Sequence, residues 1–392
     1  MKRSTSRTLT THVGSLIRPA ELVQFVVAKQ SRKDYDHEAY KKTLTKTVAD
    51  VVKTQADHGI DIPSDGEYGK AHSWSQYILD RISGFEQRPA KEGSDPFARG
   101  ADRARFPEMY KIIDGGDARG VAGQGRMDWV CTGPIKYTGM DELKQDLANF
   151  KAALSHVNVE EAFLPVAAPS SAIPDRKNEY YKSDEECMQA LATALHDEYK
   201  AIVDAGFILQ VDDARAAVTY DRMVPPGTLG DFRHWLEVHT EALNRALEGI
   251  PSDRVRYHVC WGSWPGPHTT DVPAKDIMDI VLKVKADAIS LEMANPRHEH
   301  EWRLWETVKL PKDKILLPGV ISHVTNVVEH PELVAERITR LAKLVGRENV
   351  IASSDCGFAQ ATTVQRTHPT VMWAKMDSLV EGAKIASKQL WG

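Results

Sequence analysis

The sequence lacks several features that would place the protein in other classes. No apolar run approaches the roughly 20 residues that cross a bilayer, and the first seven residues lack the apolar core of a secretion signal. Fifty Lys and Arg against 55 Asp and Glu give a net charge of −5 without a dense basic stretch, which argues against nucleic acid as the main partner. Four cysteines in 392 residues do not form a disulfide framework. These absences predict a cytoplasmic protein that acts on small molecules.

Short apolar segments alternate with helical patterns along most of the chain. One helical pattern repeats every four residues from Tyr40 to Ala56, and another begins at Ser183, where Glu186 completes a capping box. Eight segments rich in β-branched residues are predicted as strands: 9–16, 60–67, 162–168, 207–213, 255–261, 288–293, 315–322 and 350–356. Such alternation is typical of parallel strands joined by crossover helices. It predicts an α/β fold, a (β/α)8 TIM-type barrel formed by residues 1–392 as one domain.

The segment 85–158 does not follow this alternation. It is rich in Gly, Arg and Pro around 99–107, and it contains an additional strand-like run at 127–135. We expect an insertion after the second strand, in the form of a hairpin that covers the mouth of the barrel.

Four residues with side chains that bind metals lie at the ends of predicted strands. His258 and Cys260 are two positions apart, so on a strand their side chains point to the same face. Glu292 ends the next strand, and Cys356 ends the last one. Taken singly, each has an ordinary explanation, since cysteines pack as small apolar residues and carboxylates form ion pairs. Together, at one pole of a barrel, they predict a Zn²⁺ site.

These residues and their neighbours resemble the C-terminal catalytic barrel of the cobalamin-independent methionine synthase family, of which the chain would be a short, single-barrel member. The resemblance covers nearly the whole chain in order. It is carried by Thr10-Thr-His-Val-Gly-Ser15, Asp65-Gly-Glu67, Leu209-Gln-Val-Asp-Asp213, His258-Val-Cys260, Ile289-Ser-Leu-Glu292, Pro318-Gly-Val320 and Asp355-Cys-Gly357. It implies that His258, Cys260, Glu292 and Cys356 bind zinc and that a methyl group moves to the sulfur of a thiol such as homocysteine.

The resemblance also implies roles for residues around the metal site. Ser15 would bind the carboxylate of a thiol amino acid, and Glu67 and Asp212 would bind its ammonium group, with His12 lining the same pocket. His323 lies near the family's proton-shuttling histidine, one residue out of register, so Asp212 and His323 are the candidate catalytic residues. Each has a structural alternative: Ser15 as a helix cap, Glu67 and Asp212 as ion-pairing carboxylates, and His323 as a hydrogen-bonded histidine at the rim.

The chain departs from the family pattern in the region of the methyl donor. The third strand lacks the family's Thr-Gly-Pro-Val-Thr element and the tryptophan after it that stacks on folate, and Asp212-Asp213-Ala214 replaces Asp-Glu-Pro. The family's duplicated N-terminal barrel is also missing. The donor, folate included, therefore stays open. His298 and His300 resemble a second metal pair, but we interpret them as the solvated start of a helix.

Three functions of different class remain at this point. The first is a zinc-dependent methyltransferase in which a zinc-bound thiolate is the nucleophile. The second is a zinc-dependent epoxide or alkyl-thiol transferase or lyase of a catabolic pathway. The third is a zinc ion that only stabilises the fold. The sequence leaves the acceptor and the oligomeric state open, a homo-oligomer included.

Overall fold

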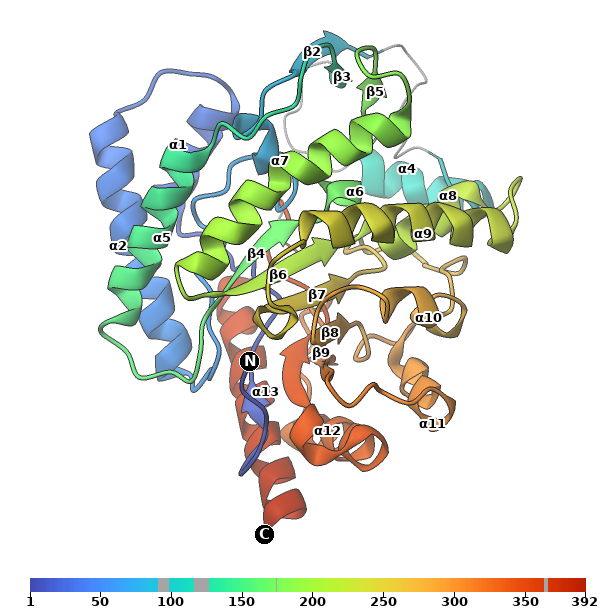
Figure 1. The fold of residues 1–392 in the computed structure, drawn as a ribbon. Helices are drawn as coiled ribbons and strands as arrows, with labels where there is room; N and C mark the ends of the chain where they lie inside the picture. The colour runs from blue at the N-terminus through green and yellow to red at the C-terminus, as the bar shows by residue number, and fades with distance from the viewer. Residues whose placement is uncertain (91–98, 116–126, 174, 363–365) are drawn as a thin grey trace.

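Seven parallel strands form a curled sheet at the centre of an α/β fold (Figure 1). The computed structural model describes residues 1–90, 99–115, 127–173, 175–362 and 366–392. From one edge to the other the strands are β1 (Leu9–Thr10), β10 (Ile351–Ser354), β9 (Ile315–Ile321), β8 (Ala288–Leu291), β7 (Val255–Val259), β6 (Ile208–Asp213) and β4 (Phe163–Ala167). Because every neighbouring pair is parallel, the carboxyl ends of these strands meet at one pole.

The segment 60–67 connects the two edges of this sheet without forming the predicted strand. Ile62 forms a single parallel bridge with Thr11, and the backbone oxygen of Pro63 accepts a hydrogen bond of 3.1 Å from the N–H of Phe163. The ladder cannot continue, because Pro63 has no N–H and the backbone turns into the left-handed region at Gly66 and Glu67, where φ is 70° and 60°. The predicted strand is therefore wrong as a strand, although its place between β1 and β4 is occupied.

Apolar side chains from around the curled sheet meet in its interior. This cluster contains Leu9, Ile62, Phe163, Ile208, Ala288, Ile315, Leu317 and Ile351. Strand β7 contributes Arg256 instead, whose guanidinium lies 4.0 Å from the centre of the Phe163 ring and donates to Thr11 and His12. These side chains fill the interior near the amino ends of the strands. Among the described residues, the space for a ligand inside the sheet lies toward the carboxyl ends of the strands.

Helices surround the sheet. They are α1 (Ala20–Gln30), α2 (His37–Asp57), α3 (Ala101–Arg105), α4 (Pro107–Gly115), α5 (Met140–Leu154), α6 (Pro169–Ala172), α7 (Asp184–Asp204), α8 (Arg215–Met223), α9 (Leu229–Ala246), α10 (Met278–Val281), α11 (Leu304–Thr307), α12 (Pro331–Val345) and α13 (Pro369–Trp391). Short 3₁₀ turns occur at Gln76–Asp80, Ser252–Arg254, Ala274–Asp276, Glu299–Arg303 and Arg347–Asn349. The helix start predicted at Ser183 is confirmed, since its hydroxyl accepts the N–H of Glu186 at 3.1 Å. The predicted capping box is only half formed, because the Glu186 carboxylate accepts the N–H of Lys182 and not that of Ser183.

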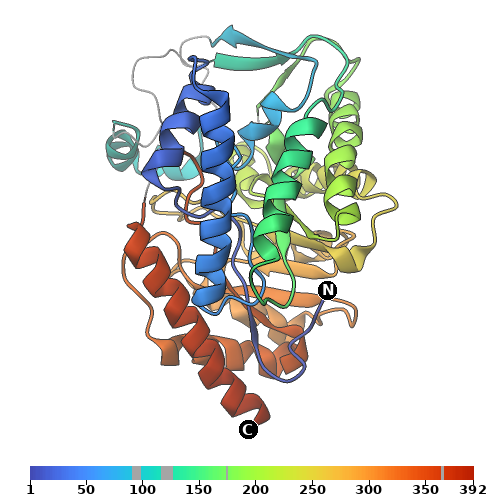
Figure 2. The same cartoon turned by 90° about the vertical axis from the view of Figure 1, so that its left-hand side faces the viewer.

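The segment 85–158 contains both a small sheet and a helix that packs with the others. Strands β2 (Phe85–Pro89) and β3 (Met127–Cys131) pair antiparallel, and β3 pairs parallel with β5 (Lys177–Asn178). Helix α5, at the end of the segment, lies beside α2 in both views (Figures 1 and 2). We call the part from Arg99 to Cys131, within the described residues, the excursion. No helix in the described residues is long and apolar enough to span a membrane.

Candidate metal centre and substrate cavity

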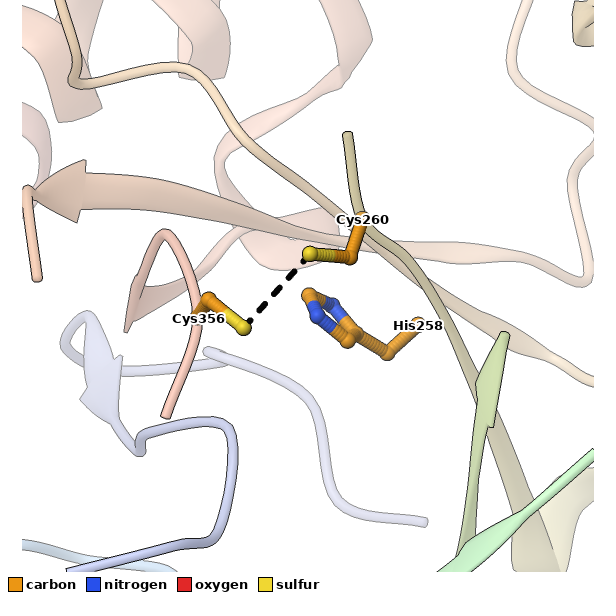
Figure 3. A group of neighbouring side chains, drawn as sticks. All are labelled: His258, Cys260 and Cys356. Carbon is orange, nitrogen blue, oxygen red and sulfur yellow. Dashed lines mark hydrogen bonds between the residues drawn. The ribbon is translucent and has the colours of Figure 1, made fainter. Parts of the chain in front are cut away.

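Three of the four predicted metal ligands meet at the carboxyl ends of the strands. His258 lies on β7, Cys260 directly follows it, and Cys356 is the second residue after β10. Their ligand atoms all lie within 4.8 Å of one another, and the two sulfurs are 3.7 Å apart (Figure 3). All three side chains are buried. The sequence therefore correctly predicted that residues from two strands distant in the chain come together.

The group has the electronic character of a soft metal site. The Nδ1 atom of His258 lies 3.1 Å from the hydroxyl of Ser290, whereas its Nε2 atom is buried with no hydrogen-bond partner among the described residues. The hydrogen bond with Cys260 holds the pKa of the Cys356 thiol well below its usual range, although burial opposes this, and the same bond raises the pKa of Cys260. An imidazole nitrogen and two sulfurs, one of them readily deprotonated, are a donor set that fits zinc.

Glu292, the fourth predicted ligand, does not belong to this group. It directly follows β8, but its Oε1 accepts the N–H of Trp261 at 2.8 Å and its Oε2 accepts the amide of Asn295 at 2.8 Å. Burial raises the pKa of this carboxyl to about 7, with the nearby charge of His298 acting in the opposite direction. The structure thus places Glu292 next to the ligand strands but engages both of its oxygens elsewhere.

The loop after β7 contributes further residues around the two sulfurs. The hydroxyl of Ser263 lies 3.4 Å from the sulfur of Cys356 and 4.0 Å from that of Cys260, and the N–H of Gly262 donates to the sulfur of Cys260 at 3.2 Å. Gly262 has a φ of 99°, and a Cβ atom there would lie 1.8 Å from the ring of Trp264. Only glycine allows this loop to fold back over the sulfurs.

A cavity of about 580 Å³ opens onto the metal group. One side of the cavity, which we call the strand-end side, lies at the carboxyl ends of the parallel strands and the segments beside them. It includes Ser15, Glu67, Asp212, His258, Cys260 and Cys356. Its excursion side consists of Arg99, Arg103, Tyr110, Met127 and Trp129. Trp74, Trp264, Arg215, Arg222 and Arg366 also line it. The cavity is large enough for a small substrate beside a metal ion.

Ser15 lies in this cavity and does not cap a helix. Its hydroxyl accepts the N–H of Ala359 at 3.2 Å, and the residue before α1 is Pro19, which has no side-chain cap. Gly357 permits this approach, because a Cβ atom there would lie 2.1 Å from the Ser15 hydroxyl. The alternative of Ser15 as a helix cap is therefore wrong.

Two buried carboxylates lie on the strand-end side. Glu67 adopts a left-handed backbone and directs its side chain inward, where Lys70 lies 3.6 Å from Oε2 without a hydrogen bond. Burial raises the pKa of Glu67, and it raises the pKa of Asp212 to about 8 against the opposing charge of His258. The amide of Gln210 donates to Asp212 at 2.7 Å. Carboxylates buried in this way gain a counter-ion when a cation enters, so they suit an ammonium group.

Two histidines predicted for the site lie beneath the cavity or behind it. His12 is fully buried, with Nε2 2.7 Å from Gln55 and Nδ1 accepting the N–H of Gly14, so the structure does not bring it to the cavity. His323, in the loop after β9, is not among the described residues that line the cavity. Burial lowers its pKa to about 4, and neither ring nitrogen has a hydrogen-bond partner in the described chain. At neutral pH its imidazole is therefore uncharged.

His298 is buried, which contradicts our interpretation of a solvated helix start, whereas His300 is exposed. The Nε2 atom of His298 lies 3.0 Å from the carboxylate of Asp271, and the ring of His298 lies 4.7 Å from the ring of Trp261. His268 also contacts Asp271, at 3.1 Å. His268 and His298 thus both contact the carboxylate of Asp271. These contacts hold in place the end of the loop that lies farthest along the chain from Cys260.

A chain of hydrogen bonds joins the excursion to the same loop. The indole of Trp264 donates to the hydroxyl of Tyr110 at 2.9 Å, and that hydroxyl donates to Asp102 at 2.7 Å. Asp102 also accepts the backbone N–H groups of His268 and Thr269, at 3.1 and 2.9 Å. We call these contacts the latch. Because they lie between segments more than 150 residues apart in sequence, no local pattern predicted them.

Comparisons with known proteins agree with this architecture. The chain is 24% identical over 386 residues to a methionine synthase of Sulfolobus acidocaldarius, covering 97% of this chain and 93% of that one. It is also 24% identical over 378 residues to a 2-hydroxypropyl-CoM lyase of Xanthobacter autotrophicus, covering 89% and 86%.

A solved structure has the same fold. The B12-independent methionine synthase from Shewanella sp. W3-18-1, in complex with selenomethionine, aligns with a TM-score of 0.70 at 19% identity, covering 98% of this chain and 99% of that one. The family described as "Cobalamin-independent synthase, Catalytic domain" matches residues 169–378, more than half of the sequence, including every residue of the metal group. The chain belongs to the cobalamin-independent methionine synthase family.

Proposed function

We propose that the protein is a zinc-dependent methyltransferase that moves a methyl group to the sulfur of a thiol amino acid such as homocysteine. One observation carries this proposal: two thiols and an imidazole converge on a cavity whose walls also hold two buried carboxylates, Glu67 and Asp212. The first set suits a metal that binds sulfur, and the second suits an ammonium group. Relatives named methionine synthase support the same reaction.

Within this proposal His258, Cys260 and Cys356 hold the metal, and Glu292 is the fourth ligand. Bound zinc would remove the proton of an incoming thiol, which is a poor nucleophile while protonated. Glu67 and Asp212 orient the amino acid by its ammonium group, and Ser15 binds its carboxylate. Such positioning contributes to the rate because the sulfur is held where the methyl group arrives.

A catabolic alkyl-thiol transferase or lyase is the second candidate, because one relative is named 2-hydroxypropyl-CoM lyase. It needs the same metal group but no contacts to an ammonium. A purely structural zinc is less well supported, because protein ligands close a structural site around the ion, whereas His258, Cys260 and Cys356 line an open cavity.

Binding of two matched thiols to the zinc-loaded protein distinguishes these functions. Homocysteine and 4-mercaptobutanoate differ by the amino group, so calorimetry should show homocysteine binding about 10- to 100-fold more tightly, the range expected for hydrogen bonds to a charged group. Glu67→Gln and Asp212→Asn should remove most of this preference while leaving 4-mercaptobutanoate unchanged. Equal affinities for the two thiols in the unmodified protein would contradict an amino acid substrate and favour the lyase.

For the architecture we infer an eight-unit barrel in which 60–67 takes the place of the second strand and part of 85–158 is an insertion. The bonds of Ile62 and Pro63 to the two edges of the sheet support this inference.

A further inference from the structure

Glu292 is held away from the metal group by two hydrogen-bond donors. The backbone N–H of Trp261 binds one carboxylate oxygen and the side-chain amide of Asn295 binds the other, each at 2.8 Å. All of these groups are buried, and Glu292 itself is 3% exposed. A carboxylate buried at this depth is stable only where donors satisfy it, so these two groups form a defined resting place, which we call the dock.

The surroundings fix the direction in which Asn295 donates. Its Oδ1 accepts the backbone N–H groups of Arg297 and His298, both at 3.1 Å. The amide nitrogen therefore faces the carboxylates, where it donates to Glu292 and also to Asp355 at 3.1 Å. Asp355 is the residue before Cys356, and its other oxygen accepts two backbone N–H groups at 2.8 Å each. Asn295 thus lies between the strand end of Glu292 and that of a metal ligand.

We propose that Asn295 is a positioning residue that controls whether Glu292 occupies the dock or the metal site. The inference rests on the proposed function, in which Glu292 is the fourth ligand. Glu292 leaves the dock when it completes the metal site, and it returns when the sulfur of a substrate takes its place. The dock therefore stabilises the protein without metal and the complex with thiol, but not the metal-loaded protein that awaits substrate.

This arrangement has a quantitative consequence. Loss of the Asn295 donor raises the free energy of the two docked states equally and leaves the third state unchanged. Zinc affinity should therefore increase and thiol affinity should decrease by the same factor, about tenfold for a hydrogen bond to a charged group. The product of the two binding constants should not change. A residue that merely stabilises the fold would weaken both or neither.

The test uses the full chain and two variants. Asn295→Ala removes the donor, and Asn295→Asp keeps the Oδ1 acceptor and the shape, so it remains informative if the alanine variant does not fold. Competition with a chelator gives zinc affinity, and calorimetry with homocysteine on the zinc-loaded protein gives thiol affinity. We expect opposite shifts of about tenfold in Asn295→Ala and shifts in the same two directions in Asn295→Asp. In a Glu292→Ala background Asn295→Ala should have no effect on either constant.

The outcomes separate this inference from the proposed function. An unmodified protein that binds neither zinc nor homocysteine would overturn the proposed function. If the unmodified protein binds both, then unchanged constants in the Asn295 variants, shifts in one common direction, or shifts that persist in the Glu292→Ala background would overturn the role of Asn295 alone.

Discussion

The two sides of the cavity differ in how they are built. The strand-end side consists of residues at the ends of β6, β7 and β10, strands paired on both flanks, together with Ser15 and Glu67 from the segments beside them. The excursion side consists of residues from short helices and a small sheet that reach the loop after β7 through the latch. The first side carries the metal group and two buried carboxylates, whereas the second carries aromatic and arginine side chains. The residues that could hold a metal therefore depend on the strand ends, whereas the opposite wall of the cavity depends on the excursion.

The largest expected effect comes from substitutions on the strand-end side alone. Replacing Cys356 by Ser or His258 by Ala should lower zinc affinity by more than about 100-fold, because changes in residues that only support ligands already cost up to that factor. Metal analysis of the purified variants measures this. Cys187→Ser is the matched control, since it changes a buried cysteine on α7 outside the metal group, and it should retain stoichiometric zinc. Full zinc in both ligand variants would refute the assignment.

A second experiment tests the placement of His12 beneath the cavity. Burial lowers its pKa from 6.5 to about 4, so protonation favours the unfolded chain. The stability that His12 contributes is present above about pH 6.5 and is lost as the pH falls toward 4, by about 3 kcal/mol. In His12→Asn the loss of stability over this range should be smaller by about that amount, measured by urea unfolding of the metal-free protein. Homocysteine affinity at pH 7.5 should stay the same. A lower affinity in His12→Asn would contradict this placement and indicate that His12 contacts the substrate.

The smallest effect concerns the latch. Tyr110→Phe removes the hydroxyl that joins Trp264 to Asp102, and we expect a loss of about 1 kcal/mol in the free energy of unfolding. Zinc and homocysteine affinities should not change if the two sides are independent. Tyr180→Phe, at a half-exposed tyrosine of another segment, is the control and should have no effect on any of these quantities. A parallel fall in zinc affinity in Tyr110→Phe would show that the excursion and the metal group act as one unit.

The contrast between the two sides also explains what could be predicted from the sequence. The alternation along strands predicted that His258 and Cys260 share a face, and parallel strands predicted that Cys356 meets them. The helix cap at Ser183 depends on residues three apart and could be predicted equally well. These features follow from local periodicity together with the geometry of a parallel sheet.

Other features depend on contacts that no local pattern encodes. The burial of His298 requires Asp271 and Trp261, which come from a different loop. The segment 60–67 has the composition of a strand, but its left-handed backbone at Gly66 and Glu67 ends the ladder after one bridge. The sequence correctly placed Glu292 at a strand end. Whether its carboxylate contacts the metal group or Asn295 depends on the direction of the side chain, which position in the chain does not determine. The aromatic residues of the excursion could not be predicted as lining the cavity, because they reach it through contacts between segments that are distant in sequence.

X-ray absorption at the zinc edge, with and without homocysteine, tests the central claim most directly. Without homocysteine we expect two sulfur neighbours, from Cys260 and Cys356. When homocysteine is added, we expect an additional sulfur and the loss of an oxygen neighbour. A first shell that is the same in both spectra would contradict activation of the thiol by the metal.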